Sequence, residues 1–266
     1  MPRALIVSPH LDDAAFSCAE PMHRLRRAGW QIDLATVFTA SIDGPTGFAL
    51  ACQTDKGIDA DVDYMALRRA EDREFGQRLD LQCHHLDLAE APHRGYDSAA
   101  ELFGTLHERD PAFGQCERSL VRLLESLRPD VCIGPLGVGR HVDHRVVVTA
   151  LARAVPRTAT RLHYADQPYS LKHPDQVDPL VHALDGATPL RFTSDAVTRS
   201  EVIEAIAAYT TQLDFQFGGE AGMRETLRAC LSGGTRFWHR GARFGPLESH
   251  LAQAPVADRS PTDKTR

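Results

Sequence analysis

The chain has 266 residues, of which 42% are hydrophobic and 25% are charged. This length suits one α/β domain, or one domain with a modest appendage, and the apolar content is enough for a full core. The net charge of −6 argues against a nucleic-acid partner, because proteins that bind nucleic acid usually carry a basic face.

Composition also bears on the compartment. No apolar run approaches the length of a membrane span, and the apolar stretch near the N-terminus is too short for a signal peptide. The six cysteines are scattered without a CxxC pair, as is typical of reduced packing residues. We therefore expect a cytoplasmic protein with no membrane span.

The N-terminal part predicts a β-α-β unit, the parallel crossover of α/β folds. Residues 4–7 read as a short buried strand, 14–29 as a helix that ends at glycine, and 30–38 as a second strand. A loop without clear periodicity follows over 39–63. It begins at the end of a strand, so it could cover a substrate, and the alternative is a surface insertion.

The rest of the chain continues the alternation of strands and helices. Asp63 is expected to N-cap the first of these helices. Helices are predicted over 64–79, 115–127, 146–154, 197–213 and 220–231, strands over 83–86, 130–135, 161–165, 189–193 and 236–239, and irregular segments over 101–114 and 172–187. We expect a single domain over 1–253 and a disordered polar tail over 254–266.

Clusters of histidine and aspartate follow two of the predicted strands. The first is Ser8-Pro9-His10-Leu11-Asp12-Asp13, and the second is His141-Val142-Asp143-His144, which follows the glycine-rich loop at 136–140. In an open α/β sheet, ligands bind at the carboxyl ends of the strands, so neighbouring strands would bring both clusters to one edge. Buried carboxylates are costly unless they are paired or metal-bound. The alternative is that Asp12 or Asp13 simply caps the following helix.

The two motifs together, PHLDD and HVDH in this order, resemble the PIG-L/LmbE-like family of zinc-dependent de-N-acetylases, most clearly over about the first 155 residues. The resemblance implies a Rossmann-like, mostly parallel sheet flanked by helices, with the active site at the carboxyl ends of the strands. It also implies that His10, Asp13 and His144 hold Zn²⁺, a mixed ligand set that accepts Fe²⁺ as well.

The resemblance assigns further roles within the site. Asp12 would be the general base, His141 would stabilise the oxyanion as an imidazolium, and Asp143 would orient an imidazole. Arg68 would face the substrate, with Glu71 one turn away as its partner.

Two further segments are similar to family patterns. Glu90 stands where an aspartate is more usual, and with the Arg94-Gly95 pair it would help to recognise sugar hydroxyls. Asp166-Gln167-Pro168-Tyr169 is similar to a turn that lines the pocket.

The implied activity is hydrolysis of the N-acetyl amide of an N-acetylglucosamine-type amino sugar in a soluble conjugate, such as a natural-product or thiol-precursor intermediate. One alternative is a zinc amidase of a thiol conjugate or another N-acyl substrate. A second is a non-catalytic nucleotide- or sugar-binding module, which predicts a glycine fingerprint after the first strand, whereas residues 8–15 contain no glycine. The expected partner is a small amino sugar, and the sequence is compatible with a homo-oligomer.

Overall fold

The computed structural model describes residues 1–156, 159–240 and 247. They form a seven-stranded sheet in the order β3-β2-β1-β4-β5-β7-β6. The first five of these strands run parallel, whereas β7 pairs antiparallel with both β5 and β6. The strands are β1 Arg3–Ser8, β2 Gln31–Phe38, β3 Gln82–Leu88, β4 Val131–Pro135, β5 Thr160–Tyr164, β6 Thr188–Phe192 and β7 Thr235–Arg240. The predicted α/β class with a mostly parallel sheet is confirmed.

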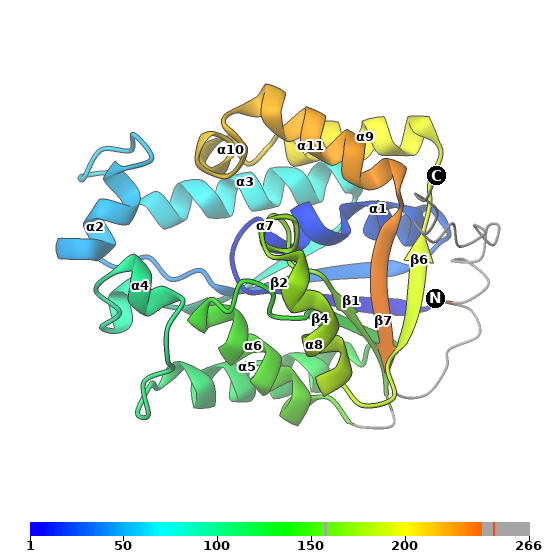
Figure 1. The fold of residues 1–266 in the computed structure, drawn as a ribbon, viewed down its shortest axis with the longest axis horizontal. Coiled ribbons are helices and arrows are strands. Elements are labelled where there is room, and N and C mark those ends of the chain that lie inside the picture. The colour runs from blue at the N-terminus through cyan, green and yellow to red at the C-terminus, as the bar shows by residue number, and fades with distance from the viewer. Residues whose placement is uncertain (157–158, 241–246, 248–266) are drawn as a thin grey trace, which may run out of the picture.

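Helices cover both faces of the sheet (Figure 1). Alternate residues of β1 face opposite layers, as the period of two requires. Ala4 and Ile6 pack against the layer of α1, α3, α9, α10 and α11, and Leu5 and Val7 pack against α5 and α6. The bounds of these helices are α1 Asp13–Arg27, α3 Tyr64–Leu79, α5 Ala112–Leu127, α6 Val142–Ala154, α9 Ala196–Ile206, α10 Thr210–Phe217 and α11 Glu220–Ser232.

The strand order places a switch point at the centre of the sheet. From β1 the chain crosses through α1 to β2 on one side, and from β4 it crosses through α6 to β5 on the other. β1 and β4 are themselves parallel neighbours. Their carboxyl ends therefore flank the crevice where ligands bind in open α/β sheets.

Several predicted elements differ in the structure. The predicted loops contain short helices, α2 Gly47–Thr54 within 39–63, and α7 Tyr169–Lys172, η2 Pro174–Gln176 and α8 Val177–Ala183 around 172–187. The stretch predicted as irregular over 101–114 overlaps the end of α4 Ala99–Leu102 and the start of α5 at Ala112, and the one-turn element η1 Ala91–Arg94 precedes it. The single helix predicted over 197–213 is wrong, because α9 ends at Ile206 and α10 begins at Thr210.

Helix α1 is kinked rather than continuous. Cys18 has non-helical dihedral angles, φ −145° and ψ 20°, and Pro21 lies three residues later. Proline has no backbone N–H and its ring clashes with the carbonyl four residues earlier, which accounts for the break.

Within the described residues, no helix combines the length and apolar character that a membrane crossing requires. The predicted domain end at residue 253 and the tail over 254–266 lie outside the part of the chain that the structure describes.

Candidate metal centre and active site

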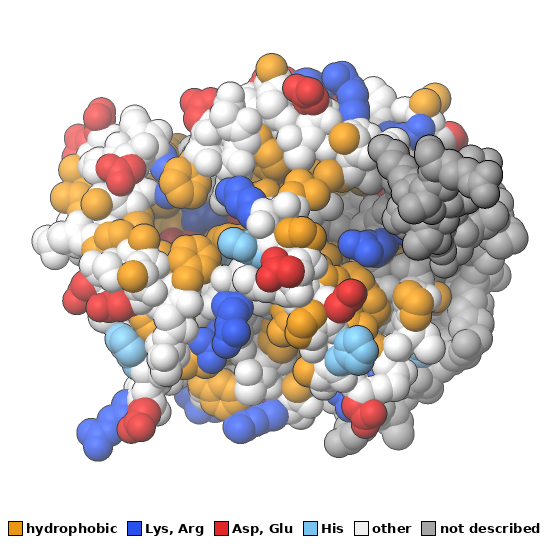
Figure 2. All heavy atoms as spheres, in the orientation of Figure 1, with side chains coloured by type: hydrophobic (Ala, Val, Ile, Leu, Met, Phe, Trp, Pro, Cys, Tyr) orange, Lys and Arg blue, Asp and Glu red, His pale blue; other side chains and the backbone are white. Residues whose placement is uncertain are grey.

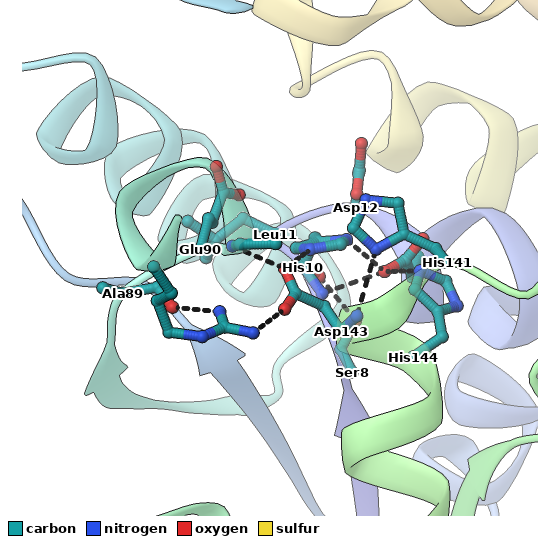
Figure 3. Close-up of polar contacts among 12 residues, drawn as sticks. Ser8, His10, Leu11, Asp12, Ala89, Glu90, His141, Asp143 and His144 are labelled. Atoms are coloured by element: carbon teal, nitrogen blue, oxygen red, sulfur yellow. Dashed lines mark hydrogen bonds and ion pairs between the residues drawn. The ribbon is translucent and has the colours of Figure 1, made fainter. Parts of the chain in front are cut away.

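Both histidine–aspartate clusters lie at the switch point. Residues 9–12 connect β1 to α1, which begins at Asp13. His141 is the N-cap of α6, and Asp143 and His144 lie in the first turn of that helix. Ser8 shapes the first connection, because its hydroxyl donates to the His10 carbonyl at 2.6 Å and accepts from the Ala14 N–H at 3.0 Å. Figure 3 shows the side chains from the two connections gathered at the ends of the strands.

Three ligand atoms converge on one point. Asp13 Oδ2 lies 3.3 Å from His10 Nδ1 and 3.1 Å from His144 Nε2. His144 is fully buried, and its Nε2 has no hydrogen-bond partner among the described residues. A buried, orphaned imidazole nitrogen beside a carboxylate and a second imidazole is the donor set that a catalytic zinc ion takes. The residues present therefore fit a metal ion.

Each of the two imidazoles is held by a carboxylate on its other nitrogen. His10 Nε2 lies 2.9 Å from Asp143 Oδ2, and His144 Nδ1 lies 2.6 Å from Asp166 Oδ1. Asp166 is oriented in turn by the Gly137 and Val138 N–H groups, which donate to its Oδ2 at 2.8 and 3.0 Å. Such outer partners fix the tautomer and the ring orientation of metal-binding histidines.

A second group, His10, His141 and Asp143, also has the right residue types for a metal. However, the acceptor positions of Asp143 are already occupied. Its Oδ2 accepts from the Ala91 N–H at 3.0 Å as well as bonding to His10, and its Oδ1 accepts from Arg94 Nη2 at 2.8 Å. The structure therefore favours the His10–Asp13–His144 group.

The buried carboxylates of the site favour positive charge beside them. Burial opposes ionisation of Asp13, but the charges of His144 and His10 outweigh it and hold the pKa of Asp13 well below its usual value. Burial likewise opposes a charged His144, yet Asp13 and Asp166 raise its pKa to about 9. Both shifts have the same cause, which is the attraction between the buried carboxylates and the imidazole of His144.

Asp12 is in a different environment from its neighbour Asp13. It is 5% exposed, and burial together with the charge of Asp13 raises its pKa to about 7. Arg68 lies beside it, with Nη2 3.7 Å from Asp12 Oδ1. A carboxylate with a pKa near neutrality, beside the ligand cluster, can exchange a proton with a reacting group.

The imidazole of His141 is held as a neutral donor. The Asp143 N–H donates to His141 Nδ1 at 3.2 Å, which leaves the proton of the ring on Nε2. Burial lowers the pKa of His141 to about 3. Both observations favour a neutral ring with its proton on Nε2 over the imidazolium form expected from the sequence. The ring of His141 stands edge-on to that of His10, with 5.0 Å between the ring centroids.

Arg68 and Glu90 are brought together beside Asp12. Arg68 is 4% exposed, and its Nη1 donates to Glu90 Oε1 at 2.6 Å. The expected pair of Arg68 with Glu71 is wrong. Glu71 is buried on the same helix, but it accepts hydrogen bonds from Thr210 and Thr211 at the start of α10.

Two residues have roles that differ from those the sequence indicated. Arg94, expected at sugar hydroxyls, is instead enclosed between carboxylates, donating to Asp143 and, through Nε and Nη2, to Asp110. Asp166, expected only to line the pocket, is the partner of His144. One sequence feature could have indicated this role of Asp166. The residue comes just after β5, which is the next strand along the same sheet edge.

A cavity of about 290 Å³ adjoins the site on the side of Glu90. Residues 41–65 supply most of its lining, so the segment predicted as a loop over 39–63 lies on the same side of the site as Glu90. Figure 2 shows a hollow in this face of the molecule, with charged side chains inside and hydrophobic side chains around its rim.

Residues 5–155 match the model of the PIG-L family, described as GlcNAc-PI de-N-acetylase. The chain belongs to this family. A 2'-N-acetylparomamine deacetylase of Streptomyces fradiae is 30% identical over 261 residues, covering 97% of this chain and 88% of that protein. An enzyme of the same name from Niallia circulans is 26% identical over 257 residues, covering 88% and 89%.

Solved structures agree on the PIG-L fold. A zinc-inhibited form of a teicoplanin deacetylase superposes with a TM-score of 0.71 at 19% identity, covering 89% of this chain and 97% of that one. A deacetylase of the A40926 pseudoaglycone gives 0.70 at 22% identity, covering 91% and 99%. The resemblance drawn from the two sequence motifs is confirmed, and the protein is a hydrolase of the de-N-acetylase class.

Proposed function

We propose that this PIG-L family member removes the N-acetyl group from an amino sugar in a small glycoside of the aminoglycoside type. The observation that carries the proposal is the convergence of His10 Nδ1, Asp13 Oδ2 and His144 Nε2 next to the buried Asp12. The substrate class is supported by two relatives that match nearly the whole chain and are both deacetylases of 2'-N-acetylparomamine.

His10, Asp13 and His144 would hold the metal. Zn²⁺ bound there would polarise the acetyl carbonyl and make a water molecule more acidic. The same ligand types accept Fe²⁺, so elemental analysis of the purified protein decides between the two metals.

Asp12 carries out the proton transfers. Asp12 accepts the proton of the attacking water as the new C–O bond forms, and it returns a proton to the nitrogen as the C–N bond breaks. The products are then acetate and the free amine. Positioned proton transfer of this kind contributes about 10²- to 10⁴-fold to the rate.

His141 acts on the carbonyl oxygen. Its Nε2–H donates a hydrogen bond that strengthens as negative charge develops on this oxygen. The neutral form suits the task, because the Asp143 N–H already occupies Nδ1 and fixes the direction of the donor.

Arg68 and Glu90 would hold the sugar. Glu90 lines the cavity and is bound by Arg68 through Oε1 only, so Oε2 can accept from a hydroxyl or an ammonium group of the substrate. Arg68 links this contact to Asp12, since its other terminal nitrogen lies 3.7 Å from the Asp12 carboxylate.

The test is acetate release by zinc-loaded protein. The panel contains 2'-N-acetylparomamine, N-acetylglucosamine, an N-acetylglucosaminyl inositol and an N-propionyl analogue of the first compound, with Asp12→Asn as the control. We expect acetate and a free amine from the acetylated aminoglycoside. The Asp12→Asn protein should bind zinc normally and lose at least about 10²-fold in kcat.

Two outcomes would count against the proposal. Preferred cleavage of the longer acyl group would favour the broader amidase function over a de-N-acetylase. Zinc binding without turnover of any compound, in wild type as in Asp12→Asn, would favour a non-catalytic module.

A further inference from the structure

Phe103 is an exposed aromatic side chain beside the reactive centre. It is 44% exposed, although it is a large hydrophobic residue. Its ring stands edge-on to the ring of His141, with 5.3 Å between centroids, and lies 6.0 Å from the ring of Tyr169. Tyr169 stands edge-on to His144 at 5.4 Å. The two aromatic rings thus form one wall next to both motif histidines.

The position of Phe103 is fixed by the segment that carries it. The neighbouring Leu102 and Leu106 pack against the cluster of Ala91, Tyr96 and Val142. Arg145, which follows His144 on α6, donates to the Gly104 carbonyl at 2.8 Å. The segment is therefore anchored to the helix that bears the catalytic histidines, and the exposure of Phe103 is not a consequence of a loose chain.

The wall places an aromatic surface beside the charged groups of the site. Asp12, Arg68 and Glu90 offer charged groups that can bind the hydroxyl, amide and amine groups of a ligand. A pyranose ring has polar edges and also C–H groups that form apolar patches on its faces. A rigid aromatic ring gains contact area against such a patch with little loss of side-chain entropy.

We propose that Phe103 is a specificity-determining residue that binds the apolar face of the sugar ring carrying the acetamide. The contact would hold the ring beside His141, so that the acetyl oxygen lies in reach of the Nε2–H. This inference deepens the proposed function and rests on it. It predicts that the enzyme distinguishes cyclic sugar amides from acyclic N-acetyl amines through this residue.

The test compares Phe103→Ala, Phe103→Leu and Phe103→Trp with wild type. The substrates are 2'-N-acetylparomamine and N-acetylethanolamine, which has the amide but no ring. For the sugar, we expect Phe103→Ala to raise KM about tenfold, equivalent to ~1.4 kcal/mol of binding, with little change in kcat. Phe103→Trp should keep KM near that of wild type, and Phe103→Leu should lie between the two.

Phe215→Ala is the matched control. Phe215 is more exposed than Phe103, at 64%, but its ring packs against Lys56 instead of a site histidine. We expect its KM to stay at the wild-type value. For N-acetylethanolamine, kcat/KM should be the same in Phe103→Ala and wild type.

A second readout does not depend on turnover. The native tryptophans, Trp30 and Trp238, are both buried, so a tryptophan introduced by Phe103→Trp in the Asp12→Asn background reports on the site. Its fluorescence should change on titration with 2'-N-acetylparomamine and remain unchanged with N-acetylethanolamine.

A failure of the inference about Phe103 can be distinguished from a failure of the proposed function. If Phe103→Ala lowered kcat equally for both substrates, or left KM for the sugar unchanged, Phe103 would be a packing partner of His141 and the inference would be wrong. If wild type released no acetate from any compound, the proposed function would itself have failed.

Discussion

At the scale of single residues, Asp12 and Asp13 show how neighbouring carboxylates acquire different chemistry. Both are buried, but Asp13 faces two imidazoles whereas Asp12 faces one arginine at 3.7 Å. The pKa of Asp13 is held well below its usual value, which suits the proposed role as a metal ligand, whereas the pKa of Asp12 is raised to about 7. Separated pKa values in a pair of adjacent acids are a sign of divided roles.

Asp166 should control metal affinity without being a ligand. In Asp166→Asn the ring of His144 loses its anionic partner, so we expect zinc affinity to fall about 10- to 100-fold. His144→Ala should abolish stoichiometric binding, because it removes a ligand. Competition with a chromophoric chelator measures both, and equal affinity in Asp166→Asn and wild type would contradict the assignment.

Arg94 should also affect zinc affinity, through Asp143 and His10. It holds Asp143, and Asp143 holds His10, so Arg94→Met leaves a buried carboxylate without its cation. We expect weaker zinc binding and a loss of about 3–5 kcal/mol in the free energy of unfolding. Arg94→Lys should recover part of both, since it restores the charge without the two-pronged geometry. Isothermal titration measures the zinc affinity of each variant, and urea unfolding measures its free energy of unfolding. Partial recovery of both in Arg94→Lys is the decisive result.

At the scale of elements, Glu71 joins α3 to α10 through three hydrogen bonds of 2.7 Å. Glu71→Ala leaves the Thr210 and Thr211 groups without this acceptor, so we expect a loss of about 1.5–3 kcal/mol in stability. Glu74→Ala is the control on the same helix. It removes only an exposed ion pair with Arg78, worth less than about 1 kcal/mol. Urea unfolding of both variants provides the measurement.

The same contact explains one limit of sequence-based prediction. The helix at 64–79 was predicted to the residue, because Asp63 is a local N-cap that accepts from the Ala66 N–H. The break between α9 and α10 has a non-local cause. Glu71 binds the first residues of α10, and the buried Tyr209 before it donates to Asp72. Neither contact can be inferred from residues 197–213 alone.

The candidate site could likewise be predicted only in part from the sequence. The meeting of the two clusters at one edge could be predicted, because each cluster follows a strand and parallel neighbours end at one edge. The choice of His10, Asp13 and His144 within the clusters came from the family resemblance. The partners of Arg68 and Arg94 could not, because Glu90 and Asp110 reach them from loops whose paths depend on packing. Loops have no periodic sequence pattern from which their positions could be predicted.

At the scale of the whole molecule, metal binding should be coupled to pH. The pKa of His144 is raised to about 9 in the metal-free protein, so at neutral pH a metal ion must displace a proton from this ligand. Protons compete with the metal, and zinc affinity should therefore rise as the pH increases from 6 to 9. Titrations in buffers of different ionisation enthalpy measure the protons released. Affinity that stayed flat over this range would show that His144 is already neutral.

The switch point also has a consequence for how the molecule resists unfolding. The hydrogen bond between His10 and Asp143 spans 133 positions, and the ligand atoms meet only when β4 has paired with β1. Contacts of such large sequence separation are costly to form early, so the metal pocket should be absent from the transition state for folding. Bound zinc should then lower the rate constant of unfolding and leave that of refolding almost unchanged. The ion would extend the lifetime of the native state but would not accelerate its formation.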